Sequence, residues 1–489
     1  MRPVSAADCG AHLFRGSRRT HLGNRGRLKM DDESQIAEKR RIRAEKKAER
    51  KQHAANLDPT VSASTNPIHD PQKARQSYKL REMKSVAPGT MDQSAGNQSA
   101  KSVKIMTWNI LAQCLVRRTL FPGSDCLKWK DRGPAITQEI VDYEPDVICL
   151  QEVDRLADHQ TVLCAAGYEV LHVIGGYEED GKQHGLLIGW KQDLLHLVDQ
   201  KVIRFDEQEF KSRVGLSRAT RNVGLIAGLA FKHHPGGLVI GTAHLFWHSR
   251  YSYERTRQTA FLAKALGEFE IQDRDTTHWP VFLAGDLNEQ PGGPSYRLLS
   301  GAALPEKEQL ILKESTLIHK SADHLLNKKT NETYVTFEGD EDRVFKDVRP
   351  SRVEDGLFDI HELKELFGSR RWLSLYGNWA EKMSGEQDNW FKDRPEFKDQ
   401  GEKAQATPCP DELGSGQYEP MWTNFTPLWR CTLDYIWVLC KGINSISNIE
   451  VRALLPTHRT ETLEPGLPRL GVEPSDHIAL MAEVIIPCL

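Results

Sequence analysis

The hydrophobic pattern of this 489-residue chain separates a polar first part from a core that begins at Val103. The core opens with the run VKIMTWNIL, in which β-branched, aliphatic and aromatic residues are concentrated. Such runs, when four to eight residues long and bounded by polar segments, predict buried strands. Further strands are predicted at Val147–Gln151, Leu186–Trp190, Val223–Phe231, Leu238–His244, Val281–Gly285, Leu433–Leu439 and Ile478–Ile486.

Segments with helical spacing of apolar residues lie between these strands. Helices are predicted at Gly133–Tyr143, Asp154–Ala166 and Ser252–Glu268, and the last keeps one largely apolar face. Short strands that alternate with helices indicate a layered α/β or α+β domain with buried sheets. No internal repeat is visible in the sequence.

The strand pattern fades between about residues 302 and 420, where charged residues mix with many aromatic ones. A structureless loop of this length is improbable in a compact domain, so we expect an elaboration with helices of its own. Two interpretations of its aromatic residues stay open: they anchor the elaboration to the core, or they stack on unpaired bases. These residues are Trp372, Tyr376, Trp379, Trp390, Phe391 and Phe397.

Residues 1–102 are predicted to form a disordered, basic tail and linker. The first 29 residues carry many basic side chains and a single acid, as mitochondrial transit segments do, although their glycines break an amphipathic helix and Met30 offers an alternative start. The run IAEKRRIRAEKKAERK, at residues 36–51, fits a solvated charged helix, a nuclear-localisation patch or an RNA-binding arm. Residues 53–102 are rich in Ser, Asn, Pro and Gln and cannot form a core.

Composition limits the partners and the compartment. The formal net charge is −3, so contact with nucleic acid requires a local groove or the tail. The nine cysteines are scattered without a C-x-x-C pair, which suits neither a disulfide framework nor a zinc site. We therefore expect the cytoplasm or nucleus, with the mitochondrion as the alternative. No apolar run approaches the ~18 residues of a membrane span, so no membrane partner is expected.

Polar side chains follow or end several of the predicted strands. They occur in TWN (107–109), LQE (150–152), TAHL (242–245), GDLN (285–288), LDY (433–435) and PSDH (474–477). Each motif alone is weak, because a lone DLN is usually a turn and a lone histidine usually has a structural hydrogen bond. Together they supply the carboxylate, amide and imidazole groups that hydrolysis of a phosphodiester needs.

The order of these motifs, with TRNVGL between LQE and TAHL, resembles the endonuclease/exonuclease/phosphatase superfamily over about residues 103–484. The resemblance implies a DNase I-like, four-layer α/β (α+β) sandwich in which helices flank two packed sheets, with residues 103–489 as the catalytic domain. WNILAQ, DVICLQEVD, HLFWH and WTNFTPLWRCTLDYIWV resemble the branch of deadenylases, nocturnin, Angel and fungal nocturnin-like RNA exonucleases. No leucine-rich repeat precedes the domain, which favours a stand-alone, monomeric enzyme over a scaffold-docked one.

That branch implies a magnesium-dependent 3′-to-5′ exoribonuclease that acts on single-stranded RNA, either poly(A) tails or ribosomal RNA 3′ ends, and releases 5′-mononucleotides. Mg²⁺ prefers oxygen ligands, which suits Glu152 as the direct ligand with Asn109 and Asp476 nearby; Mn²⁺ is an alternative ion. The alternative function is a phosphatase or phosphodiesterase of the same superfamily that acts on a small nucleotide or another phosphoester. An inactive RNA-binding module is disfavoured, since the residues that hydrolysis needs are all present.

The resemblance also implies roles for the remaining motif residues. Asp286 orients or deprotonates the attacking water, and Asn288 fixes that carboxylate and donates to the phosphate. His477 holds a nonbridging oxygen or assists proton transfer, and Asp434 sets its tautomer. His244 clamps the phosphate from the opposite side. Three further candidates are Asn222 beside the phosphate and, for substrate binding, Trp429 and Asn424.

Two departures from the branch pattern bear on the substrate. This chain has His248-Ser249 where the branch often has an acid or amide followed by Pro, and His184-Gly185 where the branch often has Asp before Gly. Neither removes a metal ligand. Both put strict selectivity for poly(A) in doubt.

Overall fold

The structure is a computed structural model that describes residues 80–86, 100–176, 182–271, 276, 278–323, 335–337, 345–379, 416–440 and 449–488. The predictions for residues 1–79, and those for Trp390, Phe391 and Phe397, lie outside the described residues. In the described part of the chain, no helix is long and apolar enough to cross a membrane.

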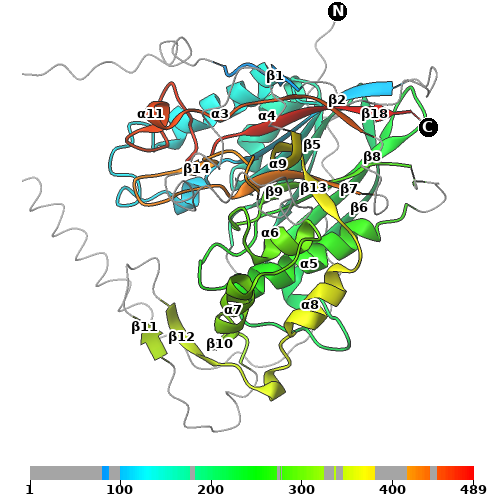
Figure 1. Ribbon diagram of the computed structural model, residues 1–489. Coiled ribbons are helices and arrows are strands. Elements are labelled where there is room, and N and C mark those ends of the chain that lie inside the picture. The colour runs from blue at the N-terminus through cyan, green and yellow to red at the C-terminus, as the bar shows by residue number, and fades with distance from the viewer. Residues whose placement is uncertain are drawn as a thin grey trace, which may run out of the picture. The chain divides into compact units, whose positions relative to one another are not determined.

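Two mixed β-sheets form the centre of the domain (Figure 1). The first has the order β1 (Lys84–Ser85), β17 (Glu450–Leu454), β18 (Leu480–Pro487), β2 (Ala100–Asn109), β3 (Val147–Val153), β5 (Gly185–Lys191) and β4 (Tyr168–Ile174). The second has the order β13 (Trp372–Ser374), β16 (Asp434–Leu439), β9 (Val281–Asp286), β8 (Gly237–Ala243), β7 (Val223–Phe231) and β6 (Leu195–Arg204). In each sheet one central pair is parallel, β2 with β3 and β8 with β9, and the other pairs are antiparallel.

The alternation of side chains along the strands produces the layers. On β2, Val103 and Ile105 face the core between the two sheets, whereas Met106 and Trp108 face the helices on the outer side. On β7, Leu225 belongs to the same inter-sheet core. Because both faces of these strands are covered, their sequences are continuous apolar runs instead of alternating ones. This explains why short apolar runs marked the strands.

Helices cover the outer face of each sheet (Figure 1). α3 (Trp129–Tyr143) and α4 (Leu156–Ala165) pack on the first sheet. The second sheet is covered by α5 (Ser252–Gly267), α6 (Pro294–Leu299), α7 (Glu306–Glu314) and α8 (Ile360–Phe367). The predicted four-layer α/β sandwich is thereby confirmed.

The predicted strands and helices all appear, with small shifts of their ends, and β7 has the predicted bounds. β4 and β6 were missed because polar, partly exposed residues interrupt their apolar pattern. α5 differs from its prediction as an amphipathic helix, since nearly all of its residues are buried. Its charged residues are accommodated in pairs: Arg257 donates to Glu254 at 2.7 Å, and neither side chain is exposed.

The described part of the 302–420 elaboration contains α7, α8 and α9 (Leu375–Trp379), as predicted. It also contains strands that the sequence did not reveal: β10 (Leu317–His319), β11 (Val335–Phe337), β12 (Phe345–Pro350) and β13, which pairs with β16 at the edge of the second sheet. Trp372 and Tyr376 are fully buried, and Trp379 packs against the inter-sheet core. For these three residues, anchoring to the core is the correct interpretation.

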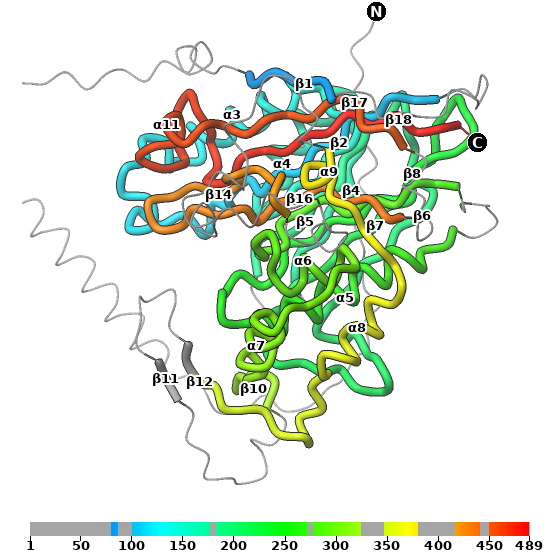
Figure 2. Tube along the Cα trace, in the orientation of Figure 1, coloured from blue at the N-terminus to red at the C-terminus, as the bar shows by residue number. Residues whose placement is uncertain are grey.

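Part of the predicted linker belongs to the domain. β1 pairs with β17 and extends the first sheet, and β2 begins at Ala100 (Figure 2). The expectation that the chain is a disordered linker up to residue 102 is therefore wrong for residues 80–86 and 100–102. The short β1 could not be predicted, because its pairing depends on a strand more than 350 residues later in the chain.

Candidate active site

The polar residues of the two central sheets meet at one end of the sandwich. Asn109 ends β2, Asp286 ends β9, and Asp434 begins β16 directly opposite Asp286. Asn109 joins the two sheets, since its side-chain nitrogen donates to Glu152 Oε1 at 3.1 Å and to Asp286 Oδ2 at 3.0 Å. The antiparallel pairing of β16 with β9 explains how residues 148 positions apart in the sequence come together.

Glu152 occupies a β-bulge in β3. Gln151 pairs with Leu186 and Val153 pairs with Gly185, so Glu152 is the extra residue between them, and its φ is +62°. A left-handed conformation costs a non-glycine residue about 1–2 kcal/mol. The bulge directs the carboxylate toward the site, where Glu152 Oε2 accepts from the Ala112 amide at 2.8 Å.

The protonation of Glu152 follows from its neighbours. Burial alone would raise its pKa, but the facing imidazoles and the hydrogen bonds from Ala112 and Asn109 bring the pKa below its ordinary value. Burial lowers the pKa of His184 to about 4, so the His184 ring is neutral at pH 7. Glu152 is further held by its hydrogen bonds, and His244 Nδ1 lies 3.8 Å from Glu152 Oε1.

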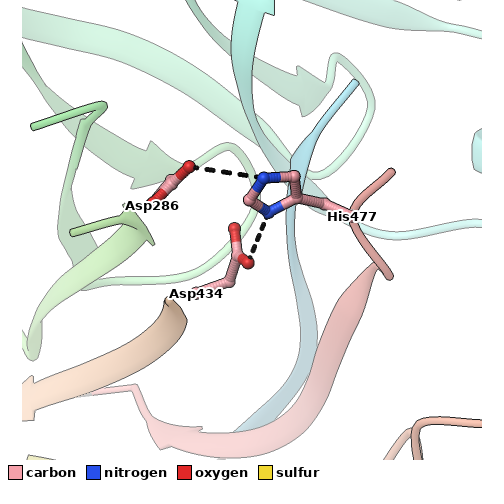
Figure 3. Close-up of side chains that lie close together, drawn as sticks. All are labelled: Asp286, Asp434 and His477. Carbon is pink, nitrogen blue, oxygen red and sulfur yellow. Dashed lines mark hydrogen bonds and ion pairs between the residues drawn. The ribbon is translucent and has the colours of Figure 1, made fainter. Parts of the chain in front are cut away.

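His477 lies between two aspartates (Figure 3). Its Nδ1 lies 2.8 Å from Asp434 Oδ2, and its Nε2 lies 3.8 Å from Asp286 Oδ2. Burial disfavours the imidazolium, but the charge of Asp434 and its hydrogen bond raise the pKa of His477 well above its ordinary value. Burial, and next the charge of Asp434, raises the pKa of Asp286. The site therefore contains a charged imidazole beside a carboxylate that is made more basic.

His244 approaches the same oxygen of Asp286 as His477, with its Nε2 3.5 Å from Asp286 Oδ2. The His244 ring thus spans Glu152 and Asp286, and the ring centroid of His184 lies 6.4 Å away. Asn222 directly precedes β7, and its Oδ1 accepts from Lys182 Nζ at 3.0 Å. Among the described residues no hydrogen bond joins Asn222 to Glu152 or Asp286, so its predicted position beside the phosphate stays a prediction.

Asn288 contributes differently from the expected way. Its backbone amide, not its side chain, donates to Asp286 Oδ1 at 2.9 Å, and its φ of +49° turns the chain sharply after β9. Its side-chain nitrogen donates to Leu245 O at 2.9 Å, which ties the end of β9 to the segment after β8. The backbone of Asn288 therefore holds Asp286, while a role of its side chain toward a phosphate stays a prediction.

Asp476 and His477 arrive on the short loop before β18. Ser475 Oγ donates to Asn109 O at 2.7 Å, and Asn424 Nδ2 lies 3.5 Å from Asp476 Oδ2. Burial raises the pKa of Asp476, and the charge of Glu152 adds to this rise. Asp476 and Glu152 are thus close enough for their charges to interact, as a shared cation would require.

Arg132 on α3 was missed by the sequence analysis, although it supports this loop. Its guanidinium is fully buried and donates to Pro474 O at 2.7 Å and to Ile110 O and Leu111 O, both at 2.6 Å. It thereby links the loop before β18 to the chain that leaves β2. In the sequence, Arg132 is only a single arginine beside a predicted helix. Because such a residue is usually solvated, nothing in the sequence indicated its role.

A short hairpin, β14 (Asn424–Phe425) with β15 (Arg430–Cys431), borders the site. Asn424 forms a β-bridge with His477, so the open end of the hairpin lies against the loop before β18. Trp429 is partly exposed near the hairpin tip, and its carbonyl accepts from the Thr426 amide at 2.7 Å. Both predicted substrate-binding residues thus belong to this hairpin: Asn424 contacts the site, and Trp429 lies at the other end of the hairpin, in the turn between its two strands.

The donor set fits a divalent cation that prefers oxygen ligands. Glu152 and Asp286 present buried carboxylates, and Asp476 adds a partly buried one whose charge interacts with that of Glu152. Potential ligand atoms of Asp286, Asp434 and His477 lie within 4.8 Å of one another. Asn109 turns its amide nitrogen toward the carboxylates while its Oδ1 accepts from the Leu111 amide at 3.0 Å. Asn109 therefore orients Glu152 in this structure, and its role as a ligand stays a prediction.

Comparison with known proteins agrees with this geometry. A model of the endonuclease/exonuclease/phosphatase family matches residues 106–477. A probable RNA exonuclease of Schizosaccharomyces pombe is 29% identical over 417 residues, which cover 80% of this chain and 77% of the relative. RNA exonuclease NGL2 of Saccharomyces cerevisiae is 27% identical over 431 residues, with 78% of each chain covered.

Among solved structures, the chain is similar to ANGEL2, described as a 2′,3′-cyclic phosphatase, in complex with adenosine-2′,3′-vanadate. The TM-score is 0.53 at 19% sequence identity, with 83% of this chain and 99% of that chain covered. At this identity the likeness concerns the fold alone. The arrangement of sheets and helices is thus that of a known fold.

Proposed function

The chain belongs to the endonuclease/exonuclease/phosphatase family, and from this premise we propose that it is a magnesium-dependent exoribonuclease that shortens single-stranded RNA from its 3′ end. The observation that carries the proposal is the buried Asp434–His477–Asp286 group beside Glu152. Relatives named RNA exonucleases, aligned over more than three quarters of both chains, support RNA as the substrate class.

The chemistry of the site suits hydrolysis of a phosphodiester. Such an ester is already anionic, so attack by water needs its charge neutralised and the water correctly placed. His477, kept positively charged by Asp434, faces the site with Nε2 and would donate to a nonbridging oxygen. Asp286 is held in place by Asn109 and the Asn288 amide and, with its raised pKa, would orient the water and accept its proton.

Glu152 would hold the cation, with Asp476 near it. When bound, the ion neutralises phosphate charge and stabilises the leaving oxygen. The bulge at Glu152 and the hydrogen bonds from Ala112 and Asn109 fix the carboxylate before the ion arrives. A pre-arranged ligand loses little freedom on binding, and this favours a specific site.

The hairpin of β14 and β15 would receive the 3′-terminal nucleotide. Trp429 offers an aromatic surface for a base, worth ~1–3 kcal/mol when an unpaired base stacks on it, and Asn424 offers an amide beside Asp476. His248-Ser249 and His184-Gly185 replace residues typical of deadenylases. We therefore propose single-stranded RNA in general, instead of poly(A) alone, as the substrate.

The decisive experiment compares substrates of one length that differ in sugar, sequence and ends. Purified protein is incubated with Mg²⁺ and 5′-labelled oligo(A), mixed-sequence RNA, the matching DNA, or the same RNA closed into a circle. We expect a ladder of shortened products and release of 5′-mononucleotides from both linear RNAs. The DNA and the circle should survive.

The matched control is Asp286→Asn, which keeps the shape of the side chain and removes its charge. It should abolish the ladder while leaving the melting temperature close to that of the parent protein. Rapid cutting of the circle would identify an endonuclease. Inert RNA together with rapid hydrolysis of a small phosphoester would contradict RNA as the substrate and support the alternative phosphatase function.

A further inference from the structure

Arg81 inserts its side chain into the catalytic domain from the segment that precedes β1. The side chain is 7% exposed, its backbone amide donates to Tyr143 Oη at 2.9 Å, and its guanidinium donates to Pro456 O and Ala479 O, each at 3.0 Å. A guanidinium is weakly hydrated, so hydrogen bonds to carbonyl oxygens compensate for the water that it loses on burial. These bonds fix its position. Arg81 is therefore a buried part of the domain.

The same guanidinium faces two buried carboxyl groups. Its Nη2 lies 3.2 Å from Glu473 Oε1 and 3.7 Å from Glu139 Oε1, and neither glutamate side chain is exposed. Burial raises the pKa of Glu473 to about 7, while the charge of Arg81 lowers it. His458 lies 2.9 Å from the same Glu473 oxygen, but burial lowers its pKa to about 3, so it brings no positive charge at neutral pH. Arg81 is the cation that opposes this pair.

Glu473 begins the loop that delivers the catalytic residues. Asp476 and His477 follow it by three and four positions, and Ala479, which accepts from Arg81, lies two positions after His477. Arg81 thus contacts both flanks of this short loop, one through a carboxylate and the other through a backbone carbonyl. Because Glu473 and His477 lie on the same short loop, displacement of Glu473 would move His477 and disturb its hydrogen bond with Asp434.

We propose that Arg81 is a positioning residue for hydrolysis: by holding Glu473 and Ala479, it keeps His477 aligned with Asp434 and Asp286. The proposal extends the proposed function, because it assumes that His477 takes part in hydrolysis. An unopposed buried carboxylate is strongly unfavourable, so without the Arg81 charge Glu473 must either take up a proton, at a cost that grows above pH 7, or move toward solvent with its loop. The segment before β1 therefore contributes to catalysis through Arg81.

The test uses full-length variants. Arg81→Met keeps the aliphatic bulk and removes the charge, and we expect kcat to fall about tenfold or more with KM changed less than about twofold, as for residues that orient catalytic groups. Arg81→Lys should fall between Arg81→Met and the parent. The decisive variant is Arg81→Met with Glu473→Gln: removing the unopposed charge should restore kcat to within about threefold of the parent, since paired residues are not additive.

Lys84→Gln is the matched control, because Lys84 is a cation on the same segment whose partner, Glu82, is 85% exposed. It should leave kcat unchanged. A melting temperature and a far-ultraviolet circular dichroism spectrum for each variant separate misfolding from misalignment. A folded Arg81→Met protein with parental kcat would overturn the proposal, as would a double variant no more active than Arg81→Met. If Arg81→Met does not fold, the double variant must fold and be active, or the proposal is wrong.

A second readout is independent of the substrate. The Nδ1 proton of His477, shared with Asp434, should give a downfield signal in the proton magnetic resonance spectrum that is absent in His477→Ala. We expect this signal to shift or broaden in Arg81→Met and to return in the double variant. If the parent protein does not hydrolyse RNA, the proposed function fails, whereas this signal still tests the role of Arg81; an unaltered signal in Arg81→Met would contradict it.

Discussion

At the scale of single residues, the chemistry of the site depends on how a few carboxylates are held. Glu152 sits at the bulge in β3 and accepts from Ala112 and Asn109. We expect Glu152→Gln to lower kcat/KM on the order of a hundredfold at limiting Mg²⁺, because the amide keeps the shape but loses the charge that binds the ion. Activity should recover in part when Mg²⁺ is raised, and a Mg²⁺ titration of initial rates measures this.

Glu169→Gln is the matched control for that experiment, since Glu169 lies on β4 of the same sheet and is only partly buried. It should show parental rates at every Mg²⁺ concentration. If Glu152→Gln behaved like this control, Glu152 would not be the residue that holds the ion.

His477 and Asp434 should act as one unit. The 2.8 Å contact raises the pKa of His477, so Asp434→Asn should lower that pKa, and the charged imidazole should then be lost at a lower pH. We expect the alkaline limb of the kcat–pH profile to move to lower pH in Asp434→Asn. The double variant with His477→Ala should be little worse than the worse single variant, because groups that act together are strongly non-additive. Losses that multiply would show two independent residues.

Much of this site could be predicted from single residues because the strands that bear them are so apolar. A carboxylate or amide at the end of a buried strand, such as Asn109 or Asp286, is conspicuous in the sequence. Arg132 and Arg81 were not recognisable in this way, because their partners are backbone carbonyls and buried glutamates that only the tertiary structure brings near. The supporting contacts of a site are thus harder to predict than its reacting groups.

At the scale of elements, the central strands could be predicted and the edge strands could not. β7 and β9 are covered on both faces, so their apolar runs are unbroken, whereas β4 and β6 alternate or mix with polar residues. β13 has three residues and is recognisable only through its pairing with β16. Burial on both faces is therefore what made the strands of the active site predictable.

A buried acid, Glu419, contacts α6, which in turn packs against β16 of the second sheet. Glu419 is fully buried and accepts from Tyr296 Oη at 2.8 Å, and the ring of Tyr296 lies 4.7 Å from that of Trp437 on β16. Burial raises the pKa of Glu419 to about 7, against 4.5 ordinarily. Between these values the folded chain keeps a proton that the unfolded chain has released, so the free energy of unfolding falls as pH rises through this window.

Glu419→Gln should remove this dependence. We expect the parent protein to lose more stability than the variant between pH 5 and pH 8, by a few kcal/mol at most, as urea unfolding at both values measures. Glu461→Gln, at an exposed position of α11 (Thr460–Leu463), is the control and should follow the parent. Equal losses in the parent and in Glu419→Gln would show that Glu419 is ionised in the folded protein.

At the scale of the whole molecule, the chain combines a catalytic domain with a long basic segment before it. The boundary between them matters, because β1 and Arg81 belong to the domain although their composition is that of a linker. Sequence patterns locate a domain edge where apolar runs begin, and a two-residue strand that pairs with β17 does not meet this criterion. In the described part of the chain, residues 80–86 already belong to the domain.

A variant that lacks residues 1–79 should therefore keep its chemistry and lose affinity for RNA. It retains Arg81 and every motif residue, so kcat at saturating RNA should stay within about twofold of the full chain, well below the tenfold losses typical of disturbed positioning groups. The removed run IAEKRRIRAEKKAERK is strongly basic, so binding at low salt should weaken. Each lost contact with a phosphate should reduce the slope of log affinity against log salt by about 0.7. Fluorescence anisotropy with a 5′-labelled RNA, on Asp286→Asn backgrounds to prevent cleavage, measures the affinity and its salt slope.

Removal of residues 1–99 should in addition lower kcat, because Arg81 is then lost. An equal kcat for the two shortened variants would show that Arg81 does not contribute to catalysis. An unchanged salt slope would show that the basic segment does not contact the RNA phosphates.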